Sequence, residues 1–384
     1  MKTPLRILHV ITGINRGGAE NHLLDLVRHQ RARGFAITVA YLRECHYWAA
    51  ALRELGAEVQ HLGLRFYGDL RPLVKLRRVI GSGGFDLVHA HLPPAELYAR
   101  LALLGAEALP LIITKHNEER FCNLPGHRLL GRWVGRRAAR VITISAAVKR
   151  YMAGDGLGLD ARKLHTVHYG INAAGFDLGR AEAAALRNEW GIAADALVIG
   201  FVGRLVAQKD LGTLLRGMAK FAQESPQARL VIVGTGAVEA EMRALADELQ
   251  IAGRIVWAGF RDDIRAVMGA FDIFALTSIY EGFGLVLLEA MACRCAVVAT
   301  RVGAIPEVLG EAGVVIAPRS PEALANAFHR LSDGAVRRPL GEAGRARVLG
   351  EFTLEKMCQA TDGLYARCVG NEGVRESGTI TANA

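Results

Sequence analysis

The chain has 384 residues, of which 51% are hydrophobic and 22% charged, with 43 glycines and 11 prolines. This composition is typical of a globular protein with a large core, and it excludes disordered, collagenous and coiled-coil proteins. The net charge of +9 is uneven, because residues 1–180 carry 26 Lys and Arg against 14 Asp and Glu, while residues 181–384 carry 21 against 24. The basic half indicates an anionic partner, either nucleic acid or an anionic lipid surface.

Short β-branched, apolar runs alternate with amphipathic segments of helical length, which predicts βαβ units and parallel sheets. The first series of predicted strands covers residues 6–12, 37–41, 58–62, 86–90, 111–115, 141–145 and 164–168. No strand is predicted from 169 to 194, and the second series then covers residues 197–203, 230–234, 255–257, 272–276, 296–300 and 314–316. Two similar α/β domains in tandem are therefore expected. Since ligands of open parallel sheets bind beyond the carboxyl ends of the strands, we expect one cleft between the two domains.

The predicted boundaries give an N-terminal domain over 1–175, a C-terminal domain over 176–352, and a helix over 353–370 that packs back on the N-terminal domain. Residues 371–384 are polar and small, which predicts a flexible tail.

Neither a membrane span nor an export signal is expected. The richest apolar run, residues 285–299, is broken by Glu289 and Arg294, and it is shorter than the roughly 18 residues that cross a bilayer. The apolar run at residues 7–14 leads into glycines instead of a cleavage site. Six cysteines without C-x-x-C pairs predict free thiols in a reducing, cytoplasmic environment.

The first glycine-rich turn follows the first predicted strand. Gly17 and Gly18 precede a predicted helix, and adjacent glycines there let the backbone approach an anion at the helix terminus. An ordinary βα turn explains the same residues equally well. The glycines at 13, 17 and 18 do not follow the G-x-G-x-x-G order, so a nicotinamide dinucleotide fingerprint is excluded.

A pair of cations follows the first strand of the second series. Arg204 and Lys209 lie five residues apart just beyond the strand over 197–203. A diphosphate bound at the carboxyl end of a strand needs such charge-assisted donors, so we favour phosphate contacts over a solvated loop.

Two glutamates flank the start of a later helix, which is predicted to begin near Gly284 or Leu285. If all residues between Glu281 and Glu289 were helical, the two carboxylates would lie ~12 Å apart along the axis. They would not converge like the carboxyl pair of a glycoside hydrolase, which is roughly 5 to 9.5 Å apart. The spacing favours two glutamates that hold the two ends of a ligand, with helix amides aimed at an anion between them. A turn glutamate and a helix-surface glutamate remain the alternative for either residue alone.

A basic amphipathic helix is predicted over residues 126–140. Arginines recur there at a four-residue step, at Arg128, Arg132, Arg136 and Arg140. A neighbouring stripe holds Leu129, Leu130, Trp133 and Val134. The helix either lies on an anionic leaflet or packs its apolar stripe into the domain core. Nucleic acid is not expected, because no stacking aromatics are interleaved with the basic residues.

Together with residues 259–263, these motifs resemble glycosyltransferase family 4, the retaining enzymes of the GT-B architecture. The resemblance extends in order over nearly the whole chain, to about residue 352, and the E-x7-E pair of Glu281 and Glu289 is its most specific part. It implies an α/β protein with two Rossmann-like parallel-sheet domains that face each other across a cleft. The domain over 1–175 would be the acceptor side, and the domain over 176–352 would bind the nucleotide sugar. One departure is Cys293-Arg294-Cys295, where the family usually has a small residue and Gly, and this bears on packing under the nucleotide.

The resemblance also assigns roles to single residues. Arg204 and Lys209 would neutralise the diphosphate, Glu289 would hold the ribose and Glu281 the sugar. Other groups would complete the site: the amides of Phe283, Gly284 and Leu285, the ring of His116 against the donor sugar, and the loop with Gly17 and Gly18 on the phosphate and acceptor side.

No metal or cofactor is expected. The sequence places no D-x-D at a strand end, and Asp262-Asp263 reads as a helix N-cap with an acidic first turn. Fixed cations and helix amides can stabilise the leaving diphosphate without a metal. The phosphate itself would take the proton of the acceptor, since no dedicated nucleophile is evident.

The predicted function is therefore transfer of a hexosyl unit from a UDP- or GDP-sugar to a glycan or lipid-linked hydroxyl, with retention, in cell-surface polysaccharide or lipopolysaccharide synthesis. The protein would be cytoplasmic, with the inner face of the membrane as a second expected location. Two alternatives stay open: a GT-B-fold sugar-nucleotide epimerase, and a non-catalytic sugar-binding scaffold subunit.

Overall fold

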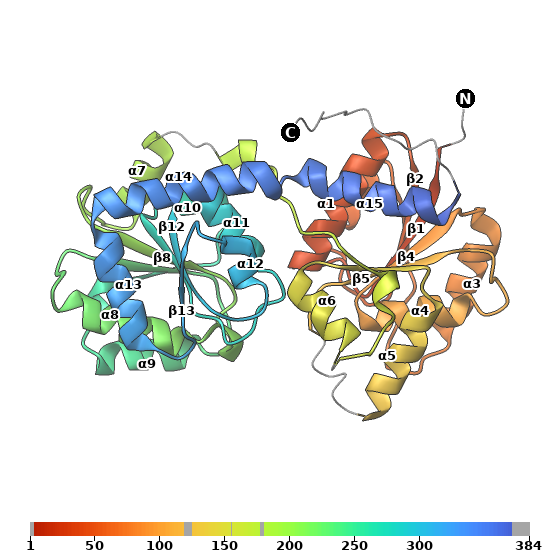
Figure 1. Cartoon of the computed structure of the whole chain (residues 1–384), viewed down its shortest axis with the longest axis horizontal. Coiled ribbons are helices and arrows are strands. Elements are labelled where there is room, and N and C mark those ends of the chain that lie inside the picture. The colour runs from red at the N-terminus through yellow and green to blue at the C-terminus, as the bar shows by residue number, and fades with distance from the viewer. Residues whose placement is uncertain (1–3, 119–124, 155, 177–179, 371–384) are drawn as a thin grey trace. The chain divides into compact units, whose positions relative to one another are not determined.

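The computed structural model describes residues 4–118, 125–154, 156–176 and 180–370 (Figure 1). It divides into two compact units, of which the first takes the chain up to Tyr169 together with the chain from Leu354 onwards, and the second takes Gly170–Thr353. The predicted tail over 371–384 lies outside the described residues. None of the described helices combines the length and the apolar character that a membrane-spanning helix requires.

The first unit contains a parallel sheet of seven strands in the order β3-β2-β1-β4-β5-β6-β7. All seven strands were predicted from the sequence, with ends that differ by no more than two residues. Their bounds are β1 Arg6–Ile11, β2 Ala36–Tyr41, β3 Glu58–His61, β4 Leu87–His91, β5 Leu111–Lys115, β6 Arg140–Thr143 and β7 Leu164–Thr166.

Helices cover both faces of this sheet. They are α1 Gly18–Ala32, α2 Ala49–Glu54, α3 Arg71–Gly83, α4 Pro93–Ala102, α5 Pro125–Arg137, α6 Ala146–Ala153 and α15 Leu354–Cys368. Figure 1 shows α1 and α15 along one face and α3, α4 and α5 along the other. The carboxylate of Asp362 on α15 accepts from Arg33 at 2.6 Å and lies 3.2 Å from the ring of His29, which ties this last helix to the α1 region.

The predicted basic helix is shorter than expected. It ends at Arg137, and Arg140 is the first residue of β6, where it pairs with Ile112. The main-chain N–H of Ala139 donates to the carbonyl of Leu111 at 2.8 Å, so the chain has already joined the sheet before Arg140. Arg140 therefore does not belong to the helical series of arginines.

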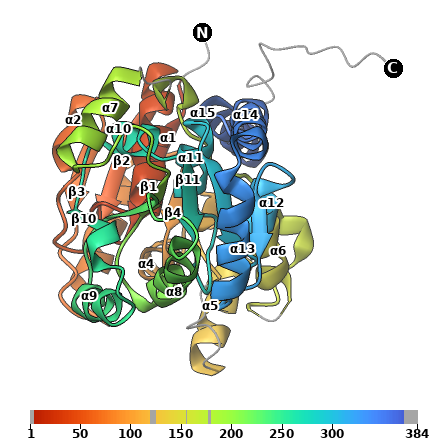
Figure 2. The same cartoon turned by 90° about the vertical axis from the view of Figure 1, so that its left-hand side faces the viewer.

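The second unit contains a parallel sheet of six strands in the order β10-β9-β8-β11-β12-β13. The bounds of these strands, all predicted, are β8 Val198–Val202, β9 Arg229–Val233, β10 Ile255–Gly259, β11 Ile273–Leu276, β12 Ala296–Thr300 and β13 Val314–Ile316. The helices are α7 Arg180–Glu189, α8 Leu211–Ala222, α9 Glu239–Glu248, α10 Ile264–Gly269, α11 Leu285–Ala292, α12 Ile305–Leu309, α13 Pro321–Ser332 and α14 Gly334–Glu351. Helices α8 and α13 pack side by side (Figure 2).

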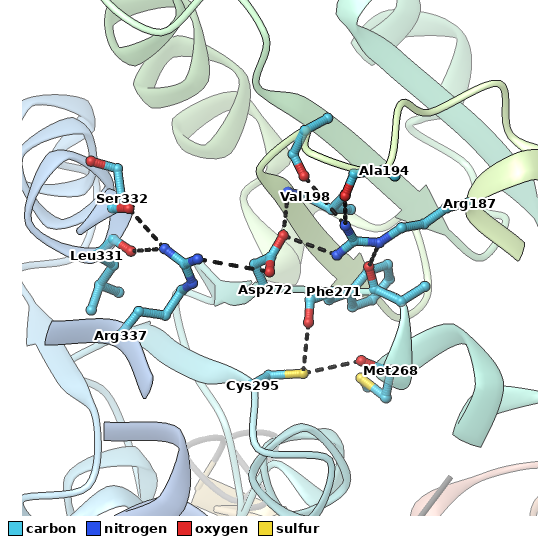
Figure 3. A network of polar contacts seen from close by, with 12 residues as sticks. Arg187, Ala194, Val198, Met268, Phe271, Asp272, Cys295, Leu331, Ser332 and Arg337 are labelled. Carbon is cyan, nitrogen blue, oxygen red and sulfur yellow. Dashed lines mark hydrogen bonds and ion pairs between the residues drawn. The ribbon is translucent and has the colours of Figure 1, made fainter. Parts of the chain in front are cut away.

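A single carboxylate joins the first and last helices of this unit at the amino end of its sheet (Figure 3). Asp272, directly before β11, accepts from Arg187 of α7 and from the main-chain N–H of Val198, both at 2.9 Å. The guanidinium of Arg337 on α14 lies 3.9 Å from its other oxygen. Two cations and a main-chain donor thus compensate one partly buried charge.

The chain enters and leaves the second unit side by side. Ile171 forms a parallel bridge with Thr353, and its N–H donates to the carbonyl of Phe352 at 3.0 Å. The segment 170–353 is therefore an insertion into the first unit whose two ends are adjacent.

The turns after β8 and β9 approach each other so closely that one of them requires glycine. A Cβ on Gly234 would lie 1.9 Å from the carbonyl oxygen of Gly203, and Gly234 has a positive φ of 128°. Two backbones are thus in direct contact at the carboxyl end of the sheet.

We predict that Gly234→Ala lowers the free energy of unfolding by about 1–3 kcal/mol, because the main chain of the neighbouring turn must move. Chemical denaturation measures this. Gly253→Ala is the matched control, since nothing lies within 4 Å of a Cβ there. An equal, small effect of both substitutions would show that the two turns are not held together.

Candidate active site

The predicted ligand groups of the second unit gather at the carboxyl edge of its sheet. Arg204 and Lys209 follow β8, and Glu281 follows β11. These strands are parallel neighbours, so their carboxyl ends meet at one edge. The N–H of Leu205 donates to the carbonyl of Thr235 at 2.9 Å, which holds the turns after β8 and β9 together.

Lys209 and Glu281 form an ion pair. The Nζ of Lys209 lies 2.6 Å from an Oε of Glu281, and each side chain is only 13% exposed. The hydroxyl of Ser278 donates to the same carboxylate oxygen at 3.3 Å. The family resemblance implies separate roles for these residues in one site, and the structure places them in direct contact.

One main-chain bond and one bond from the side chain of Gln208 keep this pair in place. The N–H of Ile279 donates to the carbonyl of Gln208 at 2.9 Å, and the amide of Gln208 donates to the carbonyl of Tyr280 at 3.0 Å. The turns that carry Lys209 and Glu281 are thereby joined directly before the two residues of the ion pair.

The guanidinium of Arg204 is available to a ligand at this edge of the sheet. Its side chain is exposed, and no described residue forms a hydrogen bond or an ion pair with its guanidinium. An anion that reaches this edge can therefore take up its donors without breaking a protein contact.

Helix α11 begins beside the glutamate turn. Gly284 precedes it with a left-handed φ of 83°, and the main-chain N–H groups of Leu285 and Val286 have no acceptor within the described parts of the chain. Such amides favour an anion. Phe283 is 2% exposed and its ring packs against that of Phe352 at 6.0 Å, so its side chain belongs to the core.

Glu289 lies on α11, as predicted, and is half-buried. Its carboxylate has no hydrogen-bond or ion-pair partner among the residues that the structure describes. Desolvation raises its pKa from 4.5 to about 7. A ligand that donates hydroxyl hydrogens to this carboxylate would stabilise its charged form.

His116, directly after β5 in the first unit, is buried and fully engaged. Its Nε2 lies 3.2 Å from Nδ1 of His91, and its Nδ1 is hydrogen-bonded to the hydroxyl of Tyr169. Burial, and to a lesser extent the nearby His22, hold the pKa of His116 well below its usual value. The ring is therefore a neutral imidazole and is not free to act as a general base.

The predicted glycine turn at the start of α1 holds an acidic side chain. Gly17 precedes the helix in an extended conformation, and Gly18 is exposed. A Cβ on Gly17 would lie 2.4 Å from a carboxylate oxygen of Glu20. A negative charge at a helix N-terminus is stabilising, and here the protein supplies one itself.

The basic helix α5 exposes part of its apolar stripe. Leu129 is 67% exposed, Leu130 42% and Trp133 38%, whereas Val134 is buried. The core interpretation of this stripe is therefore wrong for three of its four residues. Arg128 and Arg136 are also exposed, while Arg132 donates to the carbonyl of Leu157 at 2.9 Å.

Sequence reasoning missed His9, which joins the group of histidines near His116. His9 lies at the middle of β1, next to His89 in the parallel register, and nitrogens of His9, His89 and His91 lie within 4.8 Å of one another. The spacing suits a metal ion, but both ring nitrogens of each histidine already have a hydrogen-bond partner. The cluster could have been predicted from the sequence only with the strand order known, because His9 and His89 then pair in register on neighbouring strands.

Comparisons with known proteins cover both units. Residues 16–174 match the family described as Glycosyltransferase Family 4, and residues 182–347 match Glycosyl transferases group 1. The chain is 30% identical to alpha-maltose-1-phosphate synthase of Mycolicibacterium smegmatis over 319 residues, which are 76% of this chain and 81% of that protein. It is 29% identical to an uncharacterized glycosyltransferase of Methanocaldococcus jannaschii over 235 residues, 59% of this chain and 60% of the other. Among solved structures, Anabaena HepE in complex with UDP aligns with a TM-score of 0.85 and 23% identity, over 94% of this chain and 100% of that one.

We predict that Glu289→Gln stabilises the ligand-free protein at pH 8 but not at pH 4.5. The folded carboxyl keeps its proton up to about pH 7 while the unfolded one loses it near 4.5, so wild-type stability falls between these values and then levels off. The gain at pH 8 should be about 1–3 kcal/mol by denaturant titration.

Glu248→Gln, on the exposed surface of α9, is the matched control and should change the free energy of unfolding little at pH 8. A pH-independent difference for Glu289→Gln would mean that this carboxyl is not desolvated.

Proposed function

Because this chain belongs to the group 1 glycosyltransferases of the family 4 type, we propose that it moves a hexosyl unit from a nucleotide diphosphate sugar to a hydroxyl acceptor, with retention and without a metal. Its two parallel-sheet units and its structural neighbours give it the GT-B fold. The observation that carries the proposal is the set of groups near the carboxyl edge of the second sheet: the ion pair of Lys209 and Glu281, the desolvated carboxyl of Glu289, and a cation and helix amides that have no partner among the described residues.

In this proposal the diphosphate binds at Arg204 and Lys209. Arg204 is exposed and unpartnered within the described chain, and an arginine fork suits phosphate oxygens. Lys209 has three N–H donors, so it can keep its bond to Glu281 and still donate to a phosphate. Negative charge grows on the diphosphate as the glycosidic bond breaks, and fixed donors at that place lower the barrier. The HepE structures with UDP and with UDP-glucose make uridine nucleotides the first donors to test.

The two glutamates then bind opposite ends of the donor. Glu289 would accept from the ribose hydroxyls, which replaces the lost hydration of its carboxylate. Glu281 would accept from sugar hydroxyls while Lys209 holds its orientation. The amides of Leu285 and Val286 would donate to the phosphate or the sugar. From the first unit, the proposal assigns His116 to the donor sugar and the turn with Gly17 and Gly18 to the acceptor side.

Retention follows if the acceptor attacks the face from which the diphosphate departs. The acceptor oxygen forms the new bond to the anomeric carbon, the bond from that carbon to the diphosphate oxygen breaks, and the acceptor proton passes to the departing phosphate. Positive charge on the sugar and negative charge on the phosphate develop together. The cations near Arg204 stabilise the negative charge on the phosphate.

A thermal-shift panel with UDP, GDP, ADP and dTDP, each with and without EDTA, tests the donor class. One diphosphate should raise the melting temperature regardless of EDTA, because a ligand of the folded state stabilises it by mass action. The anomeric configuration of the product, read by NMR, tests retention. Isomerisation of the donor without any acceptor would favour the epimerase, and binding without turnover would favour the scaffold subunit.

We predict that Arg204→Ala lowers kcat/KM roughly 10- to 100-fold, the loss expected for one charge-assisted contact. The steady-state rate with the donor found above measures this. Arg216→Ala, which changes another exposed arginine, on α8, serves as the control and should keep wild-type activity. Full activity of the Arg204 variant would remove this residue from the phosphate site.

We also propose that α5 lies on an anionic membrane surface, which would give access to a lipid-linked glycan acceptor in polysaccharide or lipopolysaccharide synthesis. Three apolar side chains of α5 are exposed together: Leu129, Leu130 and Trp133. The exposed Arg128 and Arg136 lie on the same helix. An interfacial helix inserts its apolar side chains among the lipids and places its cations at the headgroups.

We predict that the protein co-sediments with anionic vesicles but not with neutral ones. The double variant with Arg128→Glu and Arg136→Glu should bind anionic vesicles at least tenfold more weakly, since each cation contributes about 1 kcal/mol near the surface. Arg28→Glu with Arg53→Glu, on α1 and α2, changes the net charge equally and should bind like wild type. Equal loss in both double variants would show that only net charge matters.

A further inference from the structure

A continuous path of hydrogen bonds runs through the first unit from Gln30 to Tyr169. The Oε1 of Gln30, on α1, lies 3.0 Å from Nε2 of His9. Nδ1 of His9 lies 3.1 Å from Nε2 of His91, and Nδ1 of His91 lies 3.2 Å from Nε2 of His116. Nδ1 of His116 is bonded to the hydroxyl of Tyr169. Three imidazoles in series thus connect one side-chain amide to the proposed donor contact.

Every ring of this path is neutral. Gln30, His9 and His91 are fully buried, and His116 and Tyr169 are nearly so. Burial lowers the pKa of His9 to about 4, and it holds the pKa of His91 and of His116 well below the usual value. A neutral imidazole has one nitrogen that donates and one that accepts, so the state of one ring fixes that of the next.

The amide of Gln30 sets the direction of the series. Its Nε2 donates to the hydroxyl of Tyr365 at 3.4 Å, so its Oε1, which can only accept, faces His9. Nε2 of His9 must then carry the proton, and Nδ1 of His9 must accept from Nε2 of His91. By the same rule, Nε2 of His116 donates to His91.

The last ring is thereby left with an unprotonated Nδ1. Nδ1 of His116 accepts from the hydroxyl of Tyr169, which must be the donor of that bond. Any other hydroxyl that takes the place of Tyr169 must donate to Nδ1 as well.

We propose that Gln30 is a positioning residue for glycosyl transfer: acting through His9 and His91, it holds His116 as the tautomer whose Nδ1 accepts a hydrogen bond from a hydroxyl of the donor sugar. This inference rests on the proposed function, in which His116 contacts that sugar. Positive charge develops on the sugar in the transition state, and a neutral acceptor nitrogen tolerates it, whereas an imidazolium would oppose it.

His89 lies in the same cluster but outside the path. Its ring is bonded to the hydroxyl of Tyr365 at 2.6 Å and to that of Thr114 at 2.7 Å. Thr114 is as buried as Gln30, yet no bond of the path to His116 passes through it. Thr114→Val is therefore a control that removes a buried histidine contact without removing any hydrogen bond between Gln30 and His116.

The test uses the full chain labelled with ¹⁵N-histidine and two-bond ¹H–¹⁵N spectra at neutral pH, with His116→Gln to assign the signals. Wild-type His9, His91 and His116 should each show a proton on Nε2 and an unprotonated Nδ1. This measurement needs no variant to fold. In Gln30→Met, which keeps the volume but removes the acceptor, His116 should populate both tautomers, and Thr114→Val should retain the wild-type pattern.

With a donor sugar that turns over, Gln30→Met should lower kcat roughly tenfold, the effect expected for one misplaced hydrogen bond, while the KM for the donor changes little. Thr114→Val should keep the wild-type kcat. A tautomer change in Gln30→Met without any change in kcat would overturn the positioning role.

Two spectroscopic results would also overturn the positioning role: a proton on Nδ1 of wild-type His116, which would mean a reversed Gln30 amide, or an unchanged tautomer of His116 in Gln30→Met. A metal ion bound in stoichiometric amount by His9, His89 and His91 would overturn it as well, because the metal would break the bond between His9 and His91. If the wild-type spectra are as expected but no nucleotide sugar is turned over, the tautomer series stands and the proposed function fails.

Discussion

The candidate site of the second unit depends on one constraint, which is that all six strands of its sheet run in the same direction. Residues far apart in the chain, such as Lys209 and Glu281, can meet only because β8 and β11 are neighbours that end at the same edge. The glycine turns permit the close approach, since a side chain at Gly234 or Gly303 would overlap a neighbouring carbonyl oxygen. The polar groups are thus held by rigid backbone, which limits the reorganisation that a ligand would require.

The two units differ in the burial and the hydrogen bonding of their ionisable side chains. In the second, Arg204 is exposed and the carboxyl of Glu289 is desolvated, and neither side chain has a hydrogen-bond partner among the described residues, so both remain available to a ligand. In the first, the histidines next to the sheet are buried, hydrogen-bonded and neutral. Such groups stabilise the unit only while every donor has an acceptor, because a buried polar atom without a partner costs free energy. The buried cluster therefore favours one arrangement of its protons.

The sequence predicted every described strand, because β-branched runs between helical segments are a local signal. It also placed Glu289 on a helix that begins after Gly284, since the turn and the apolar pattern adjoin in the chain. It could not predict the contact of Lys209 with Glu281, which depends on strand order, or the path from Gln30 to His116, which depends on parallel register and on helix packing. The sequence also could not predict that Leu129 is exposed, because an apolar stripe on a helix has the same residue pattern whether the domain covers it or not.

The insertion of the second unit also sets the order in which the protein is completed on the ribosome. The segment 170–353 is made in full before α15, and α15 supplies Tyr365 to the first unit, where its hydroxyl bonds to His89. During synthesis the second unit can therefore fold as a continuous piece, since its ends already pair at Ile171 and Thr353. The first unit stays unfinished until the last helix emerges, and until then His89 and Gln30 lack the hydroxyl of Tyr365 as a partner. A nascent chain that stops before α15 would thus hold a complete second unit beside an incomplete first one.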